Sequence, residues 1–196
     1  LVLARDVIDA PGMSDEDAAK GIDALLDRLY AGTKLGDQAV RLAFLDKSAA
    51  DVKARLDAAM EYGRKLPASN GKTGVVGFCW GGARTFGYAA AQPALNAAVV
   101  FYGDAPGSSD NTHETALANV KAPVLGLYAG NDARINATLP ATEAAMKKLG
   151  KSYEIRTYEG AGHGFMFGQG GAGGANLKAA QESWPGVLQF FGKHLQ

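Results

Sequence analysis

The sequence predicts an α/β protein with a mostly parallel sheet that is covered by helices on both faces. Three observations lead to this expectation: the chain length, the alternation of apolar runs with helical patterns, and a glycine-rich turn after one apolar run. The chain has 196 residues, of which 47% are hydrophobic, enough for one sizeable core and too few for two. Strand candidates that alternate with helical segments are typical of parallel sheets. We therefore expect a single domain over residues 1–196.

The predicted elements follow one another along the whole chain. Apolar runs predict strands at residues 1–4, 73–76, 97–102, 123–128 and 153–156. Capping boxes and apolar residues at helical spacing predict helices over residues 14–29, 48–63, 139–149 and from residue 177 to the C-terminus. Pro185 should start or kink the last part of that C-terminal helix. The polar segment 103–111 and the glycine-rich segment 168–174 should be loops.

Cys79, the single cysteine of the chain, lies in the segment Gly77-Phe78-Cys79-Trp80-Gly81-Gly82. A Gly-x-nucleophile-x-Gly sequence between a strand and a helix is the nucleophile elbow of α/β-hydrolases, here with Cys in place of Ser. The strained turn requires glycine at the flanking positions, where strand and helix crowd together. It also places the thiol at a helix N-terminus, whose partial positive charge favours the thiolate. Cys79 is therefore the candidate nucleophile.

His163 and Asp132 are the candidates for the base and the acid that a nucleophilic cysteine requires. His163 lies in a glycine-flanked loop just after the strand predicted at residues 153–156. Asp132 directly follows the strand predicted at residues 123–128, at the carboxyl end where parallel sheets carry catalytic groups. The order of nucleophile, acid and base is that of α/β-hydrolases.

Other readings of these residue types remain open. His113 follows a polar loop and should begin a short helix, and His194 suits the last turn of the terminal helix. Taken alone, Asp132 could be a helix cap, and Asp104, also just past a strand, competes with it. Residues 168–173 match Gly-x-Gly-x-x-Gly, but they follow the histidine loop instead of the first strand-to-helix turn, so a dinucleotide site is not favoured.

The residue roles predict acyl transfer to a cysteine. His163 would help to form the Cys79 thiolate, the backbone N–H of Trp80 would meet the oxyanion, and Asp132 would fix the histidine tautomer. Because a thiolate is a good nucleophile and a good leaving group, small esters, enol lactones or thioesters suit this chemistry better than amides.

Five segments resemble the dienelactone hydrolase family: NGKTGVVGFCWGGART, AAVVFYGDAP, PVLGLYAGNDARI, YEGAGHGFM and ANLKAAQESWPGVLQFFGKHL. The resemblance runs from about residue 56 to the C-terminus. It implies a single-domain α/β-hydrolase fold with a triad of Cys79, Asp132 and His163, and no metal or organic cofactor. The named activity of that family opens a carboxylated enol lactone, and many relatives are esterases.

The resemblance has two departures. The family's Gln-Glu-Ile-Phe-Gly-like segment, which helps to form the oxyanion hole, has no match, and residues 1–6 resemble a later strand. Either the chain is truncated at its N-terminus or the missing piece is replaced in another way. Without that piece, a second oxyanion donor is absent and a sheet edge is exposed. The family's substrate-binding arginine, four residues after the histidine, is Phe167 here, so an anionic dienelactone is less favoured.

The substrate pocket is expected to contain Met166, Phe167 and Trp80 as apolar residues, although each could equally be core packing. Arg84 and Arg134 could bind an anionic group in place of the absent arginine. Solvated surface positions are the simpler reading of both arginines.

Composition limits the classes of partner. Twenty basic and twenty acidic residues give a formal net charge of zero, and without a basic block no nucleic-acid partner is expected. No apolar stretch is long enough to span a membrane and no signal segment opens the chain, which begins at Leu1. The compartment stays open, and a small-molecule ester or lactone is the expected partner.

A rival class of function is a non-catalytic, truncated hydrolase-fold protein that acts by self-association or partner binding. An exposed sheet edge would support a homodimer, and an obligate dimer without esterase activity would favour this reading. A redox-sensing thiol would explain Cys79, but it would leave the placement of Asp132 and His163 to coincidence.

Overall fold

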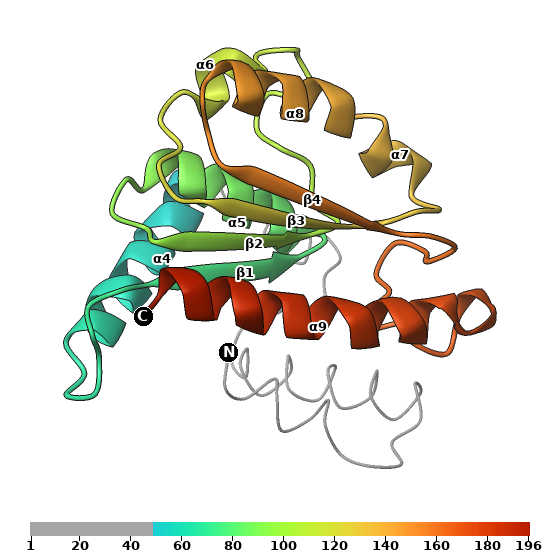
Figure 1. Cartoon of the computed structure of the whole chain (residues 1–196). Coiled ribbons are helices and arrows are strands. Elements are labelled where there is room, and N and C mark those ends of the chain that lie inside the picture. Colours follow the sequence, from blue (N-terminus) through green and yellow to red (C-terminus); the bar gives the residue numbers. More distant parts are fainter. Residues whose placement is uncertain (1–48) are drawn as a thin grey trace, which may run out of the picture. The chain divides into compact units, whose positions relative to one another are not determined.

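A four-stranded parallel sheet forms the centre of residues 49–196, which the computed structural model describes (Figure 1). The strands are β1 (Gly74–Phe78), β2 (Ala97–Phe101), β3 (Val124–Ala129) and β4 (Tyr153–Tyr158), paired in this order. Every pairing is parallel. The elements expected at residues 1–4 and 14–29 lie outside the described residues, so the single domain over residues 1–196 stays a prediction.

Helices lie on both faces of the sheet, as the alternation of elements predicts. The helical elements are α4 (Ala49–Arg64), α5 (Trp80–Ala91), α6 (His113–Leu117), α7 (Ala133–Asn136), α8 (Leu139–Lys148), the short 3₁₀ turn η1 (Ala172–Gly174) and α9 (Ala175–His194). Figure 1 shows α9 along one face, with α5 and α8 on the other. The mostly parallel sheet with helices on both faces is thereby confirmed.

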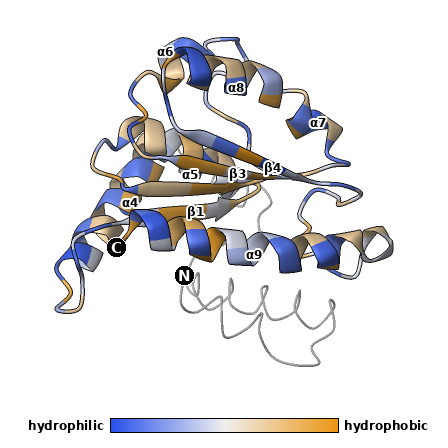
Figure 2. Ribbon diagram, in the orientation of Figure 1, coloured by the Kyte–Doolittle hydropathy of each residue, from blue (hydrophilic) through white to orange (hydrophobic). Residues whose placement is uncertain are grey.

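Two hydrophobic cores form because alternate residues of each strand point to opposite faces. On one face, Val100 of β2 packs with Phe86 of α5 and Met146 of α8. On the other face, Phe101 of β2 packs with Phe190 of α9. All five residues of β2 and all six of β3 are buried, which explains why both strands read as continuous apolar runs. Figure 2 shows these strands as hydrophobic and the outward sides of the helices as largely hydrophilic.

The C-terminal helix differs from its sequence-based prediction at Pro185. Pro185 lies inside α9, which continues through it as one helix, so it does not start a separate segment. A proline at this position leaves the carbonyl of Gln181, four residues earlier, without its helical donor. Both residues are on the exposed side of α9, where water can solvate that carbonyl.

The cores predict a large difference between two leucine truncations. Leu125 of β3 is fully buried, whereas Leu188 of α9 is 60% exposed. We expect Leu125→Ala to lower the free energy of unfolding by about 2–5 kcal/mol. Leu188→Ala should change it by no more than about 0.5 kcal/mol. Urea unfolding followed by circular dichroism measures both, and equal losses for the two variants would contradict the two-core arrangement.

Candidate active site

Cys79 lies at the turn between β1 and α5, the strand–turn–helix context that its motif predicts. Its backbone has φ 53° and ψ −122°, a conformation that costs about 1–3 kcal/mol and persists only where the surroundings hold it. The Cys79 N–H donates to the Phe101 carbonyl at 3.1 Å, and the Cys79 carbonyl accepts from the Ala83 N–H at 3.1 Å. The elbow is thus held by both β2 and α5.

The glycines around the elbow differ in the space that a side chain would have at each position. A Cβ on Gly77 would lie 2.2 Å from the Gly81 carbonyl oxygen, and one on Gly82 would lie 2.5 Å from the Phe101 carbonyl oxygen. A Cβ on Gly81 would meet no heavy atom within 4 Å. The expectation of crowding is therefore confirmed for Gly77 and wrong for Gly81, because the close approach falls one residue later.

The backbone N–H of Trp80 lies at the start of α5, directly after Cys79. Trp80 is the first residue of α5, and N–H groups in a first helical turn have no acceptor within the helix. The Cys79 side chain, although it stands at the N-cap, makes no capping hydrogen bond. The Trp80 N–H therefore has no acceptor within α5, and its role as an oxyanion donor stays a prediction.

Asp132 and His163, 31 residues apart in sequence, are joined by a hydrogen bond. Asp132 Oδ2 lies 2.5 Å from His163 Nδ1, and Asp132 Oδ1 accepts from the Ile135 N–H at 3.3 Å. Asp132 is therefore both the N-cap of α7 and the partner of the imidazole. A carboxylate at Nδ1 selects the tautomer with its proton there, which leaves a lone pair on Nε2.

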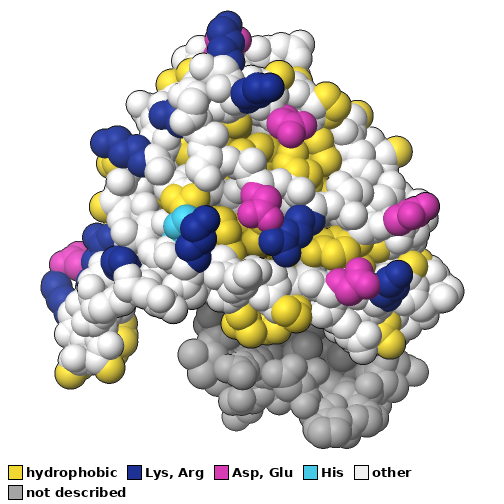
Figure 3. Space-filling view, in the orientation of Figure 1, with side chains coloured by type: hydrophobic (Ala, Val, Ile, Leu, Met, Phe, Trp, Pro, Cys, Tyr) yellow, Lys and Arg dark blue, Asp and Glu magenta, His cyan; other side chains and the backbone are white. Residues whose placement is uncertain are grey.

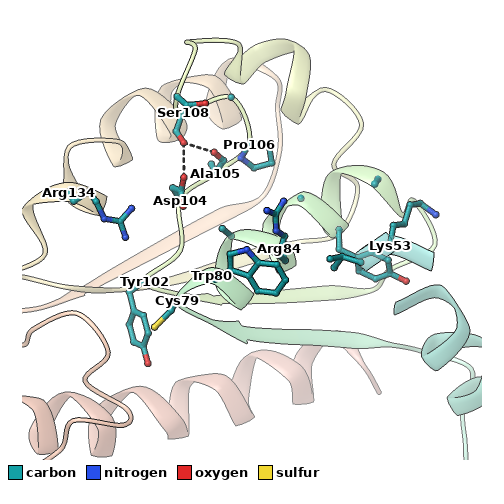
Figure 4. A pocket seen from close by; sticks show the side chains of 17 residues that line it. Lys53, Cys79, Trp80, Arg84, Tyr102, Asp104, Ala105, Pro106, Ser108 and Arg134 are labelled. Atoms are coloured by element: carbon teal, nitrogen blue, oxygen red, sulfur yellow. Dashed lines mark hydrogen bonds between the residues drawn. The ribbon is translucent and has the colours of Figure 1, made fainter. Parts of the chain in front are cut away.

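Tyr102 is a neighbour of both Cys79 and His163 that the sequence reasoning missed. Its side chain is fully buried, and its ring centroid lies 5.1 Å from that of His163. Figure 4 shows Tyr102 beside Cys79, and both residues line one cavity. Tyr102 has a left-handed backbone, with φ 37°, directly after β2. Its position at the carboxyl end of a buried strand is the signal that could have identified it.

Burial raises the pKa of the Cys79 thiol above its usual value of 9.0, and the Asp132 carboxylate raises it further. The Arg134 guanidinium acts in the opposite direction. Desolvation disfavours the charged form and so acts against the effect expected of the helix N-terminus. At neutral pH the thiol is therefore protonated, and its nucleophilicity depends on a base.

No hydrogen bond joins Cys79 to His163 within residues 49–196. Catalytic hydrogen bonds of unliganded enzymes are often long and tighten only when substrate binds. The structure thus brings Asp132 to His163 directly, and brings Cys79 near them through their shared neighbour Tyr102.

A cavity of about 560 Å³ opens beside Cys79 and continues along α5. Trp80 and Arg84 line it, and the Arg84 guanidinium carbon lies 4.9 Å from the Trp80 ring centroid. Figure 4 shows this stacked pair on one side of the cavity, with Arg134 and Asp104 across from it. Of the residues expected to form the substrate pocket, Arg84 and Trp80 are therefore in the cavity wall.

Met166 and Phe167 do not line this cavity, so their place in a substrate pocket stays a prediction. The Phe167 ring packs edge-on against Phe78 at a centroid distance of 5.6 Å, and Phe167 is 59% exposed. The Met166 sulfur accepts a hydrogen bond from the Ser183 hydroxyl of α9. Both residues follow the His163 loop toward α9, because the chain turns back there after β4.

Asp104, the competing acid, faces the cavity and not His163. Its carboxylate accepts from the Ser108 hydroxyl at 3.2 Å. Arg84 and Arg134 line the same cavity, together with Lys53 of α4, so its wall carries both signs of charge. Figure 3 shows basic, acidic and hydrophobic side chains interspersed on the face of the molecule that Figure 1 presents.

The two other histidines lie elsewhere. His113 is buried and begins α6, as expected. His194 lies in the last turn of α9, where its ring contacts that of Phe190 at 4.7 Å and burial lowers its pKa. Among residues 49–196, no group of three or more His, Cys, Asp or Glu side chains is placed to hold a metal ion. No helix within that range has the length and apolar character that a membrane span requires.

Comparisons with known proteins agree with this architecture. The profile of the dienelactone hydrolase family matches residues 9–195. A putative carboxymethylenebutenolidase of Methylorubrum extorquens is 41% identical over 123 residues, which cover 59% of this chain and 42% of that protein. A protein of the same description from Saccharolobus solfataricus is 34% identical over 157 residues, covering 79% and 57% of the two chains. The chain thus spans about half the length of these curated relatives.

A solved structure extends the agreement to three dimensions. The crystal structure of a putative dienelactone hydrolase from Klebsiella pneumoniae superposes with a TM-score of 0.61 at 30% identity, over 74% of this chain and 61% of that one. The parallel sheet, its two helical layers and the elbow at Cys79 are those of an α/β-hydrolase. The chain belongs to the dienelactone hydrolase family.

Proposed function

We propose that this chain is a hydrolase of small esters or lactones that acts through Cys79, His163 and Asp132. The observation that carries the proposal is the 2.5 Å contact between His163 Nδ1 and Asp132 Oδ2, close to a cysteine at a nucleophile elbow. Family membership adds support, since the curated relatives are described as putative carboxymethylenebutenolidases.

In the first half of the reaction, His163 Nε2 removes the proton from the Cys79 thiol. The sulfur attacks the carbonyl carbon of the substrate, and the carbonyl electron pair moves onto oxygen to form a tetrahedral oxyanion. The Trp80 N–H stabilises that oxyanion. When the oxyanion collapses, the carbon–oxygen bond of the ester breaks and protonated His163 gives its proton to the leaving alkoxide.

In the second half, water hydrolyses the Cys79 thioester. His163 takes a proton from the water molecule while the water oxygen attacks the acyl carbon. The second tetrahedral intermediate then expels the Cys79 sulfur, which regains its proton from His163, and the carboxylic acid leaves. Asp132 remains ionised throughout and stabilises the imidazolium that forms twice in each cycle.

The first test is stopped-flow hydrolysis of p-nitrophenyl acetate by the wild-type chain. We expect a burst of nitrophenolate equal to the concentration of active sites, because nitrophenolate is a good leaving group and acylation of the thiol should be faster than hydrolysis of the thioester. Cys79→Ala should abolish the burst because the nucleophile is gone. His163→Ala should slow acylation by about 10²–10⁴-fold.

A matched control for the base is His113→Ala, which removes a buried histidine outside the site. It should keep the burst rate wherever the variant folds. If wild type and all variants are folded and equally inert, the proposal fails, and self-association or partner binding becomes the leading function. Sedimentation of the same wild-type sample then tests that rival directly.

The second prediction concerns the charge next to the thiol. Arg134 lowers the thiol pKa, so Arg134→Gln should raise it further and shift the pH profile of Cys79 alkylation by iodoacetamide to higher pH. The thiol is protonated below its pKa, so at any pH below that midpoint the variant should react more slowly than wild type. Arg134→Lys keeps the charge and is the matched control. A profile that moves to lower pH in Arg134→Gln would contradict the proposed electrostatics.

The third prediction concerns the cavity along α5. Gly87 lines the cavity seven residues beyond Trp80, about 10 Å along the helix, and a Cβ there would meet no heavy atom within 4 Å. Gly87→Leu should therefore fit the fold, extend into the cavity and lower kcat/KM for p-nitrophenyl octanoate by about tenfold, while p-nitrophenyl acetate changes little. A tenfold loss corresponds to the about 1–3 kcal/mol by which a misfitted apolar group weakens transition-state binding in a hydrophobic pocket.

Gly63→Leu is the matched control for the cavity. It makes the same substitution in α4, also with open space around the new Cβ, at a glycine that does not line the cavity. Both esters should react with it as with wild type. Equal losses on the two esters in Gly87→Leu would show that the acyl chain does not enter this cavity.

A further inference from the structure

We propose that Asn176 is a positioning residue that fixes the His163 loop so that the imidazole keeps its orientation between Asp132 and Cys79. The inference rests on the proposed function, because it assigns Asn176 a part in the action of the base. Asn176 itself belongs to the first turn of α9 and does not reach the reacting atoms.

The contacts of Asn176 enclose the segment that carries the base. Asn176 Oδ1 accepts from the Gly162 N–H at 2.8 Å, and Asn176 Nδ2 donates to the Gly168 carbonyl at 2.6 Å. One of these residues directly precedes His163 and the other follows it by five positions. A single amide group therefore closes the loop that runs from residue 162 to residue 168.

The orientation of the amide is fixed by its partners. A backbone N–H can only donate and a carbonyl can only accept, so the oxygen must face Gly162 and the nitrogen must face Gly168. Asn176 is 7% exposed, and burial makes each lost hydrogen bond costly. A side chain with one polar end, or with two acceptors, cannot satisfy both backbone groups.

The loop also makes hydrogen bonds of its own that the amide completes. The N–H groups of Phe167 and Gly168 both donate to the Gly164 carbonyl, at 2.9 Å and 3.0 Å. These bonds make a compact turn directly after His163, but they are internal to the loop. Asn176 connects that turn to α9, which packs against the sheet through Val187 and Phe190.

The other side of the loop is tied to the loop that carries Asp132. Asn131 donates from its backbone N–H to the Ala161 carbonyl at 2.9 Å and from its side chain to the Gly160 carbonyl at 3.0 Å. His163 is therefore anchored on the near side by the acid's own loop and on the far side by α9 through Asn176. Movement of either anchor would change the direction in which the imidazole points.

The Asn176 side chain does not cap the helix in which it lies. Asn is a favoured N-cap residue, yet the N-cap of α9 is Gly174, and no side chain caps this helix. Both ends of the Asn176 amide bond to the His163 loop instead. The choice of residue at this position is thus explained by the loop and not by the helix.

The experiment compares Asn176→Ala with Asn96→Ala in the full chain. Asn96 is a matched control because its Oδ1 also accepts from a backbone N–H, that of Thr73 at 2.9 Å. Asn96 directly precedes β2, at the amino end of that strand, whereas the site lies at the carboxyl ends of the strands. Two readouts are taken: kcat and KM for p-nitrophenyl acetate, and the low-field proton NMR resonance of His163 Nδ1–H, assigned by its loss in His163→Ala.

We expect Asn176→Ala to lower kcat by about 10–10²-fold, the scale of a misplacement near 1 Å, with KM within about twofold because no residue of the loop lines the cavity. The low-field resonance should broaden or vanish in Asn176→Ala and persist in Asn96→Ala. Wild-type kcat with an intact resonance in folded Asn176→Ala would overturn the inference. Equal kcat losses in the two variants, with both resonances intact, would also overturn it.

A second variant keeps the inference testable if Asn176→Ala does not fold. Asn176→Asp has the same shape, keeps the acceptor for Gly162, and places a negative charge near the N-terminus of α9, where it is favourable. It loses the donor to Gly168 but keeps the contact to Gly162, so the imidazole should be displaced less than in Asn176→Ala and kcat should fall by about tenfold. Wild-type kcat in this variant would overturn the inference. If wild-type protein has no esterase activity, the proposed function fails, while the resonance still reports whether Asn176 orients His163.

Discussion

The hydrogen bond between Asp132 and His163 depends on the pairing of β3 with β4. The arrangement of much of the candidate site depends on the same strand pairing. The backbone bonds between these strands continue past their ends. The Gly130 N–H donates to the Tyr158 carbonyl at 2.8 Å, and the Asn131 N–H donates to the Ala161 carbonyl at 2.9 Å. Because the two loops leave the sheet as a bonded pair, a carboxylate and an imidazole far apart in sequence arrive within 2.5 Å of each other. A shift in the register of β4 would separate them.

The same principle of strand register accounts for Cys79 and Tyr102. Phe78 of β1 is the register partner of Phe101 of β2, so the residues that follow them leave the sheet side by side. Both have positive φ, 53° at Cys79 and 37° at Tyr102. Strained backbone of this kind is retained where the surrounding structure holds it and is concentrated at functional sites. One pair of neighbouring strands thus fixes both Cys79 and the ring that lies against His163.

The sequence was sufficient to predict features that depend on local pattern, but not those that depend on distant contacts. Buried strands such as β2 read directly as apolar runs, and Cys79 stands in a motif whose geometry is local. The raised thiol pKa could not be predicted, since it follows from burial and from Asp132, which only the folded chain brings near. Tyr102 looked like the last residue of a strand, and its place between Cys79 and His163 was missed. Sequence distance does not give the direction in which a side chain leaves the sheet.

Trp80 would connect the proposed chemistry with the cavity beside it. Its backbone N–H is the oxyanion donor of the proposed reaction, whereas its ring supports the Arg84 guanidinium in the cavity wall. A guanidinium that stacks on an indole is held by dispersion and by the ring quadrupole, and it keeps its donors for other partners. A substrate group that moved Arg84 would therefore also press on the residue that carries the oxyanion donor. In the proposed reaction, binding in the cavity and stabilisation of the oxyanion would therefore involve the same residue, Trp80, through its ring and its backbone N–H.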